Sequence, residues 1–218
     1  MPSYDLHVHS LFSDGELVPA EIARRYSELG YEAVAITDHA DNSNIEFILS
    51  SLGPACEELS KHSGIKVVPG VELTHVPPGM LAGLVEKAKE LKARVIVVHG
   101  ETIVEPVAKG TNAAAVRLND VDILAHPGLI TEEEASLAAE NDIYLELSAR
   151  KGHCITNGHV AQMAQNTDAK LIVNTDAHSP SDIIEPEMVV KVAVGAGLDE
   201  ELSNIITTVN PGSLLGDL

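Results

Sequence analysis

The sequence predicts an α/β fold in which seven parallel strands alternate with helices and close, or nearly close, into a barrel. Seven short runs rich in β-branched residues recur along the chain, and most are apolar on both faces, as strands of a buried parallel sheet are. Segments of helical periodicity separate them at intervals of roughly 22 to 33 residues, the spacing of right-handed βα units. An open doubly wound sheet is the alternative that the same alternation allows.

Each element follows from a local pattern. Strands are expected where the apolar runs stand, at residues 4–8, 33–37, 66–70, 94–98, 121–125, 143–147 and 170–174. Helices are expected where apolar residues recur with helical spacing, at residues 19–30, 44–62, 80–92, 131–142, 158–168 and 199–209. Several of these segments end in Gly, Asn or Asp, as helix stops do. No linker or low-complexity tract divides the chain, so we expect a single domain over residues 1–218.

The composition limits both the core and the partners. Hydrophobic residues make up 44% of the chain but aromatic residues only 3%, so Val, Ile, Leu and Ala must build the core. The 14 basic and 33 acidic residues give a net charge of −19, which argues against broad contact with nucleic acid or an anionic membrane. We therefore expect no long nucleic acid and no membrane among the partners. Two or three bound divalent ions would, however, return about four to six positive charges to one place.

Two features bear on the compartment. Cys56 and Cys154 are too few for a disulfide scaffold, which favours a reducing compartment. The first residues lack the basic and apolar regions of a signal peptide, and the longest apolar runs are shorter than a membrane span. We expect a soluble, cytoplasmic protein.

Polar side chains collect at the ends of the expected strands. His7 and His9 stand one residue apart on the first strand, and therefore on the same face. Six of the ten histidines stand at or just after a strand end: His7, His9, His39, His99, His126 and His178. In α/β barrels the loops at the C-terminal ends of the strands build the active site, so this distribution predicts a site there.

The residue types at these ends suit metal ions. Imidazole binds Zn, Fe and Mn, and a carboxylate can bridge two ions. With Glu72, Asp176 and Asp14, the six histidines make nine potential ligands. Since one catalytic zinc uses about three protein ligands, nine are about right for three ions. Neighbouring ions about 3.5–4 Å apart are the arrangement of phosphatases and nucleases.

The motifs HVHSLFSDG, ITDH, GVE, VVHG, LAHPG and NTDAH, in this order, resemble those of the PHP (polymerase and histidinol phosphatase) superfamily of metal-dependent phosphoesterases. The resemblance covers nearly the whole chain. It implies a distorted (β/α)7 TIM-like barrel with a trinuclear metal cluster at the C-terminal ends of the strands. The three divalent ions would be Zn, Mn or Fe.

The resemblance also implies a ligand set. The first ion would be held by His7, His9, Glu72 and Asp176; the second by Glu72, His99 and His126; and the third by Asp14, His39 and His178. Asp14 and the glycine after it could instead form only a turn. Asp38, which precedes His39, either orients an imidazole or caps its own loop.

Arg150 and Lys151 follow the sixth strand, at the active end of the barrel. Arg can hold a phosphate through two hydrogen bonds, and Lys can add a point charge, so we expect both to bind substrate; a surface ion pair is the alternative for Arg150. The segment 100–112 is long for a simple connection and predicts a lid or a substrate wall. Its residues Glu101 and Glu105 contact either substrate or water, and His75 is expected at the surface.

These observations favour a metal-dependent phosphoesterase, above all a phosphomonoesterase that hydrolyses a small-molecule phosphate ester through the trinuclear cluster and a bridging hydroxide. The expected catalytic residues are Glu72, Asp176 and His178. One alternative is a phosphodiesterase or nuclease acting on short oligonucleotides or nucleoside bisphosphates. Another is a non-catalytic metal-binding or structural PHP module. The sequence leaves open whether the chain forms a homo-oligomer.

Overall fold

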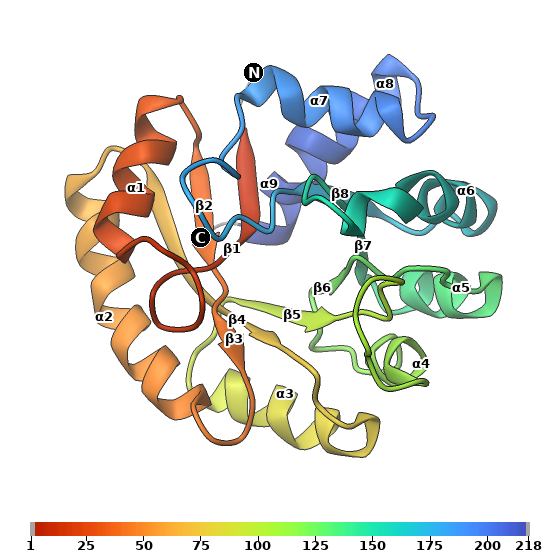
Figure 1. The fold of residues 1–218 in the computed structure, drawn as a ribbon, viewed down its shortest axis with the longest axis horizontal. Helices are drawn as coiled ribbons and strands as arrows, with labels where there is room; N and C mark the ends of the chain where they lie inside the picture. The colour runs from red at the N-terminus through yellow and green to blue at the C-terminus, as the bar shows by residue number, and fades with distance from the viewer. Residues whose placement is uncertain (1–2, 217–218) are drawn as a thin grey trace.

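The structure, a computed structural model, describes residues 3–216. Its centre is a sheet of eight parallel strands in the order β1-β2-β4-β5-β6-β7-β8, with the short β3 paired to β4 (Figure 1). The strands are β1 (Tyr4–Val8), β2 (Ala33–Ile36), β3 (His39–Ala40), β4 (Lys66–Leu73), β5 (Val95–His99), β6 (Ile123–Ala125), β7 (Tyr144–Ser148) and β8 (Leu171–Asn174). All seven expected strands are present, within one or two residues except at the end of β4.

The sheet curls until its first and last strands meet. Val8 forms a parallel bridge with Ala177, and the backbone N–H of His9 donates to the carbonyl oxygen of Ala177 at 2.9 Å. The backbone N–H of Leu6 donates to Oδ1 of Asn174, also at 2.9 Å. A few such hydrogen bonds join the first and last strands, in place of a regular ladder of backbone hydrogen bonds. The barrel is therefore nearly, but not fully, closed. The predicted distorted TIM-like barrel is confirmed, and the open sheet is excluded.

Helices surround the strands (Figure 1). They are α1 (Pro19–Glu28), α2 (Ile45–His62), α3 (Leu81–Glu90), α4 (Thr111–Ala115), α5 (Glu132–Glu140), α6 (Asn157–Thr167), α7 (Pro186–Gly195), α8 (Glu200–Asn204) and α9 (Asn210–Leu215), with single turns η1 (Pro78–Met80) and η2 (His153–Thr156) and the π-helical turn η3 (Ile205–Val209). The helices α4, α7 and α9 were not expected. They are short or start at proline, and α7 is too uniformly apolar to show a helical period.

Side chains of each strand alternate between the barrel interior and the surrounding helices. On β5, Val95 and Val97 belong to the interior cluster, whereas Ile96 and Val98 pack in the outer layer against helices. His99 continues the inward series at the end of the strand. The same two-residue period turns the last polar side chains of β4, β7 and β8 toward the axis.

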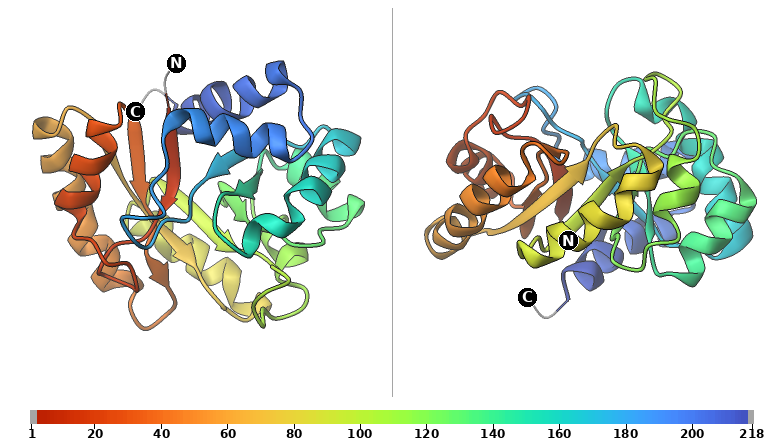
Figure 2. Two further views of the ribbon diagram at one scale, coloured as in Figure 1. Left: turned by 45° about the horizontal axis from the view of Figure 1, so that its top comes forward. Right: turned by 90° about the horizontal axis from the view of Figure 1, so that it is seen from below.

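The opposite end of the barrel is closed by the C-terminal segment. Leu215 is buried in the interior cluster, and Leu214 packs against it. Figure 2 (right) shows this blue segment on the side of the strands away from the green loop that follows β5. Hydrophobic side chains thus fill one end, and the other end is left to polar groups. Among the described residues, no helix combines the length and apolarity that crossing a bilayer requires.

Candidate metal centre

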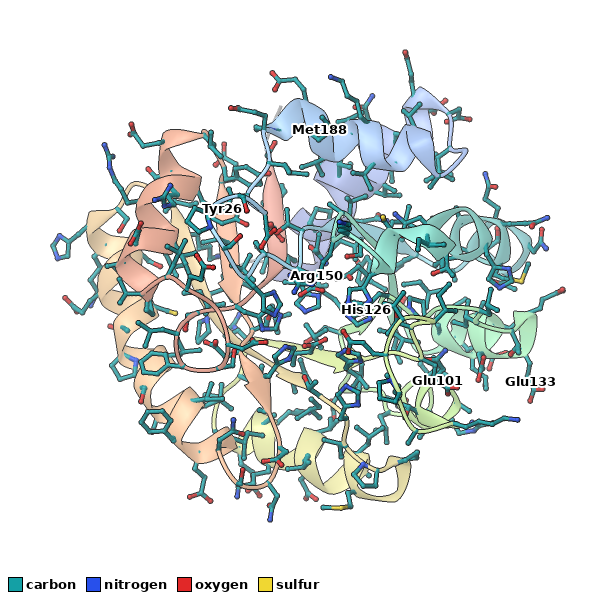
Figure 3. All side chains as sticks on the ribbon, viewed as in Figure 1. Tyr26, Glu101, His126, Glu133, Arg150 and Met188 are labelled. Atoms are coloured by element: carbon teal, nitrogen blue, oxygen red, sulfur yellow. The ribbon has the colours of Figure 1, made fainter. Side chains whose placement is uncertain are left out.

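The nine residues expected to bind metal converge at the C-terminal ends of the strands. Figure 3 shows the site near the centre of the molecule, beside the labels of His126 and Arg150. Five groups, four of which share residues, have ligand atoms within 4.8 Å of one another, namely His9–Asp14–His39–His178, His7–Glu72–His126, His7–His9–Asp176, His75–His99–Glu105 and His126–His153–Asp176. All nine expected residues belong to at least one of these groups. Three further residues, His75, Glu105 and His153, join them.

His7 lies at the bottom of the site and is fully buried. Its Nδ1 donates to Oε2 of Glu146 at 2.7 Å, and its Nε2 lies 3.4 Å from Oε1 of Glu72. Burial alone would lower the pKa of His7, but the carboxylates of Glu146, Glu72 and Asp176 raise it well above its usual value. The bond to Glu146 therefore fixes the ring and turns Nε2 toward the other carboxylates, as in metal-bound histidines.

His9 has the opposite electrostatic environment. Its ring lies between those of His39 and His178, at centroid distances of 4.1 and 4.0 Å. Burial, with the neighbouring imidazoles, holds the pKa of His9 well below its usual value. Its Nε2 is 3.2 Å from Oδ1 of Asp176. A neutral imidazole with free lone pairs is the form that binds metal.

Several buried nitrogen and oxygen atoms of the site have no hydrogen-bond partner among the described residues. They are Nε2 of His7, both ring nitrogens of His9, Oε1 of Glu72, Nδ1 of His126 and Oε1 of Glu146. Buried polar atoms are nearly always paired, and exceptions call for an explanation such as an ion. Imidazole and carboxylate donors together suit divalent transition metals. The residues present therefore fit bound metal ions.

The outer part of the site is formed by Asp14, His39 and His178. Oδ1 of Asp14 lies 3.5 Å from Nε2 of His39 and 3.2 Å from Nε2 of His178. On the inner side, Nδ1 of His39 is 2.6 Å from Oε2 of Glu72, so His39 links the two parts.

Asp38 holds the turn that follows β1, not its own loop, and among the described residues it is hydrogen-bonded to no imidazole. It accepts hydrogen bonds from the backbone N–H and the hydroxyl of both Ser10 and Ser13, at 2.7–3.1 Å. These bonds hold the turn that leads to Asp14. In that turn, a side chain on Gly15 would collide with the carbonyl oxygen of His9 at 2.3 Å. The turn thus brings Asp14 back over the first strand.

Two of the expected ligands have strained backbones. His126 has φ of 28° and Asp176 has φ of 53°, both in the left-handed region. Non-glycine residues rarely adopt it, and holding one there costs about 1–3 kcal/mol. At His126 the turn interrupts the strand alternation, and Nε2 lies 3.6 Å from Oε1 of Glu72 and 3.7 Å from Oδ2 of Asp176. Such strain at element ends is typical of functional sites.

Sequence reasoning missed four residues of the site. Glu146 stands in the middle of an otherwise apolar strand, on the same face as Tyr144, and this lone carboxylate was the signal. Glu105 was expected to contact substrate or water, and His153 was not expected as a ligand, because only the folded loops bring the two together. His75 is 42% exposed, yet Nε2 lies 3.3 Å from Oε2 of Glu105, so it belongs to the rim of the site as well as to the surface.

A cavity of about 250 Å³ opens over the site. Arg150 lines it, and its Nη1 donates to the backbone oxygen of Asp176 at 3.0 Å while Nε lies 3.6 Å from Oδ2 of Asp176. Lys151 is exposed and does not belong to the residues that line the cavity. Of the two expected substrate-binding residues, only Arg150 is therefore placed at the site.

Comparison with known sequences gives a family. The chain matches the family model of RNase P subunit p30 over residues 2–217. An uncharacterized protein of Methanocaldococcus jannaschii is 50% identical over 205 residues, which are 93% of this chain and 94% of that protein. Ribonuclease P protein component 3 of Methanosarcina barkeri is 27% identical, over 97% of this chain and 88% of its own. The DNA polymerase/3'-5' exonuclease PolX of Bacillus subtilis is 26% identical over 80% of this chain and 34% of its own.

Comparison with solved structures gives the fold. A chain of archaeal ribonuclease P with mature tRNA, 17% identical, superposes with a TM-score of 0.73 over 96% of this chain and 89% of that one. A two-domain protein of Bacteroides vulgatus that contains a predicted PHP-like metal-dependent phosphoesterase, also 17% identical, gives 0.53 over 83% of this chain and 53% of its own. Together with the family match, this shared fold confirms the resemblance to the PHP superfamily.

Two expectations from the sequence are wrong. A phosphomonoesterase acting on small molecules is contradicted, because the family model and the relatives just described point to a ribonuclease P protein component. The exclusion of long nucleic acid is contradicted by the same matches and by the structure with tRNA. The net charge of −19 is a sum over the whole chain, and such a sum does not report on a local surface or on contacts made through partners.

The match over residues 2–217 spans every strand and helix of the barrel, and the 50% identical relative has nearly the same extent. The chain therefore belongs to the RNase P subunit p30 family, on a PHP-type barrel.

Proposed function

We propose that this chain is an RNA-processing protein that hydrolyses phosphodiester bonds of RNA with the help of bound divalent metal ions. The observation that supports it most is the set of five imidazole and carboxylate groups at one end of the barrel, with buried nitrogen and oxygen atoms that lack a hydrogen-bond partner among the described residues. The family and one relative are named for RNase P, and another relative for a 3'-5' exonuclease. Phosphodiesters of nucleic acid are the substrates that these names share.

In this proposal three divalent ions, of Zn, Mn or Fe, bind at the barrel mouth. The first would be held by His7, His9, Glu72 and Asp176, the second by Glu72, His99 and His126, and the third by Asp14, His39 and His178. Bound ions of this kind lower the pKa of water and neutralise phosphate oxygens.

The protein's own side chains position the ligands and the RNA. Nδ1 of His178 lies 2.9 Å from the backbone oxygen of Asp176 and 2.8 Å from Nη1 of Arg150, and Nε2 faces Asp14. Arg150 is held against Asp176 and has further N–H groups to offer the cavity, so it is suited to hold a phosphate of the RNA backbone. We expect Glu72, Asp176 and His178 to be indispensable for the reaction.

The charge of the chain bears on how RNA reaches the site. A net charge of −19 repels RNA, and three divalent ions would add only about six positive charges. We therefore propose that a partner protein or a structured RNA complex presents the substrate. The archaeal ribonuclease P that contains a chain of the same fold was solved with tRNA, which fits this proposal. A cytoplasmic location belongs to the same proposal.

The test combines metal analysis with RNA cleavage. The purified chain is reconstituted with Zn, Mn or Fe, its metal content is measured by elemental analysis, and it is incubated with a precursor tRNA and with a single-stranded RNA. We expect bound metal and cleavage of at least one RNA, both lost or sharply reduced in His9→Ala. His62→Ala is the matched control, since His62 is exposed on α2, far from the site. Both RNAs are supplied at high concentration to offset weak binding by the chain alone, and a metal-loaded chain that still cleaves neither RNA would contradict the hydrolase proposal.

A second candidate is an RNA-binding subunit without hydrolytic activity. The names of the component 3 relatives favour it. It predicts that RNA binding, measured by gel shift, is the same for wild type and His9→Ala, with no cleavage by either. A site built only for binding would not, however, explain the unpaired buried donors of His7 and His9.

A further inference from the structure

The segment between β5 and α4 forms a closed loop over one side of the barrel mouth. Oε1 of Glu101 accepts hydrogen bonds from the backbone N–H of Gly110 at 2.9 Å and of Asn112 at 3.0 Å. These bonds tie the two ends of the loop together. The residues in between, 102–109, are therefore held as one closed loop.

Glu105 is the residue of this loop that reaches the histidines. Oε2 lies 3.1 Å from Nε2 of His99, and Oε1 lies 3.4 Å from Nε2 of His153. Donor atoms bound to one tetrahedral ion at about 2.0–2.2 Å lie about 3.3–3.6 Å from one another. Each of these two distances is close to the separation of ligands on one ion, and Glu105 forms one of the five groups with His75 and His99, as His153 does with His126 and Asp176.

His153 has the surroundings of a ligand. Its ring is buried and stacks on that of His126 at a centroid distance of 4.1 Å. Nδ1 is 2.8 Å from the hydroxyl of Thr102, at the start of the same loop. A hydrogen bond at Nδ1 orients the ring and leaves Nε2 for a metal ion, and here Nε2 faces Glu105 and Asp176.

We propose that Glu105, beside His99, and His153, beside His126, are additional ligands of the divalent ion on the loop side of the mouth. The proposal deepens the metal-dependent function proposed above, because neither residue belongs to the motifs that predict the nine-ligand set. Since Glu105 lies on the loop and His153 is held by Thr102, binding of this ion fastens the loop over the site. Occupancy of the ion and the position of the loop are thus coupled.

The first test measures metal binding without RNA. The metal-depleted full chain is titrated with Co²⁺, and the ions bound per chain, their affinity against a chelator and the visible absorption spectrum are recorded. In Glu105→Gln and in His153→Ala we expect one class of ion to bind at least about tenfold more weakly, with a changed spectrum. Glu133→Gln and His62→Ala, at exposed positions outside the site, are the matched controls and should bind like wild type.

The second test measures the loop. Trypsin cuts after Lys109, which is exposed on the loop, and the cut is identified by mass. In wild type we expect the metal to slow this cut, and in Glu105→Gln we expect the metal to have no effect on it. If Glu105→Gln is cut faster by the same factor with and without metal, Glu105 is only an ion-pair tether. That result, or unchanged metal affinity in both variants, would overturn the proposal.

The outcome is independent of RNA hydrolysis. A chain that binds the ion through Glu105 and His153 but leaves RNA intact contradicts only the proposed function. A chain that cleaves RNA while both variants bind metal like wild type contradicts only the additional ligands.

Discussion

Nδ1 of His7 lies 2.7 Å from Oε2 of Glu146, and both side chains are fully buried. Nδ2 of Asn174 donates to the same carboxylate oxygen at 3.0 Å. Glu146 is therefore held on β7 and in turn holds the ring of His7 on β1, across the interior of the barrel. The orientation of the deepest imidazole depends on a carboxylate that need not touch a metal itself.

Glu146→Gln should weaken metal binding without unfolding the chain. The amide keeps the shape of the side chain but loses the charge that supports the His7 proton at Nδ1. We expect metal affinity to fall by about 10- to 100-fold, as for other groups that orient a metal-bound histidine. Chelator competition on the purified variant measures it, with Glu133→Gln as the control. Equal affinities in both variants would show that Glu146 plays no part in metal binding.

Arg150→Ala should impair RNA binding more than the chemical step. Arg150 lines the cavity. Its Nη1 contacts Asp176 and His178, whereas its Nη2 has no hydrogen bond to a described residue and can bind a phosphate. We expect KM for RNA to rise about tenfold, with a smaller change in kcat. Steady-state kinetics of RNA cleavage measures the changes in KM and kcat separately. Lys151→Ala, at the neighbouring exposed position, serves as the control. A fall in kcat alone would assign Arg150 a different role.

The stability of the barrel should depend on pH through Asp122, remote from the metal centre. Burial raises the pKa of Asp122 to about 6 from 3.8. The folded protein therefore takes up this proton at a higher pH than the unfolded chain does, and the group stabilises the fold as the pH falls toward 3.8. From about pH 7.5 to about pH 5, wild type should gain on the order of 1 kcal/mol over Asp122→Asn. Urea unfolding at both values measures the difference, and a constant difference would argue against the raised pKa.

Thr131→Ala should cost stability but leave the metal centre intact. The hydroxyl of Thr131 accepts from the backbone N–H of Glu134, and the carboxylate of Glu134 accepts from the backbone N–H of Thr131 at 2.9 Å. This capping box at the start of α5 is worth about 1 kcal/mol. Urea unfolding of Thr131→Ala, compared with Glu133→Gln in the same first turn, measures the loss. Metal content should not change, and a loss of metal would show that α5 affects the site.

The strands could be predicted because strands that are buried on both faces consist of runs of apolar residues. The ends of these strands then located most of the site. Glu72 was expected just after its strand but lies within β4, which continues three residues past the expected end. The helix α7 escaped prediction because its apolar residues show little helical periodicity, and only packing distinguishes it from a strand.

The rest of the site depends on contacts that no local pattern contains. Glu105 and His153 are 48 residues apart, and the paths of two loops decide that they meet. Glu146 could have been predicted, since the two-residue period of β7 places it on the inner face. The prediction of a small-molecule substrate without long nucleic acid was wrong because net charge describes the whole chain. Recognition of a nucleic acid depends on one surface of the protein and on its partners.

The contact of β1 with β8 has a consequence for synthesis on the ribosome. His9 meets Ala177 across almost the full length of the chain, and the histidines of the site range from His7 to His178. Contacts of such sequence separation form slowly, and until β8 emerges one side of β1 has no strand to pair with. An unpaired edge of this kind invites pairing with other chains. A metal ion that binds only the completed ring of strands stabilises the finished barrel by mass action, so metal supply during translation should influence how much of the nascent protein escapes aggregation.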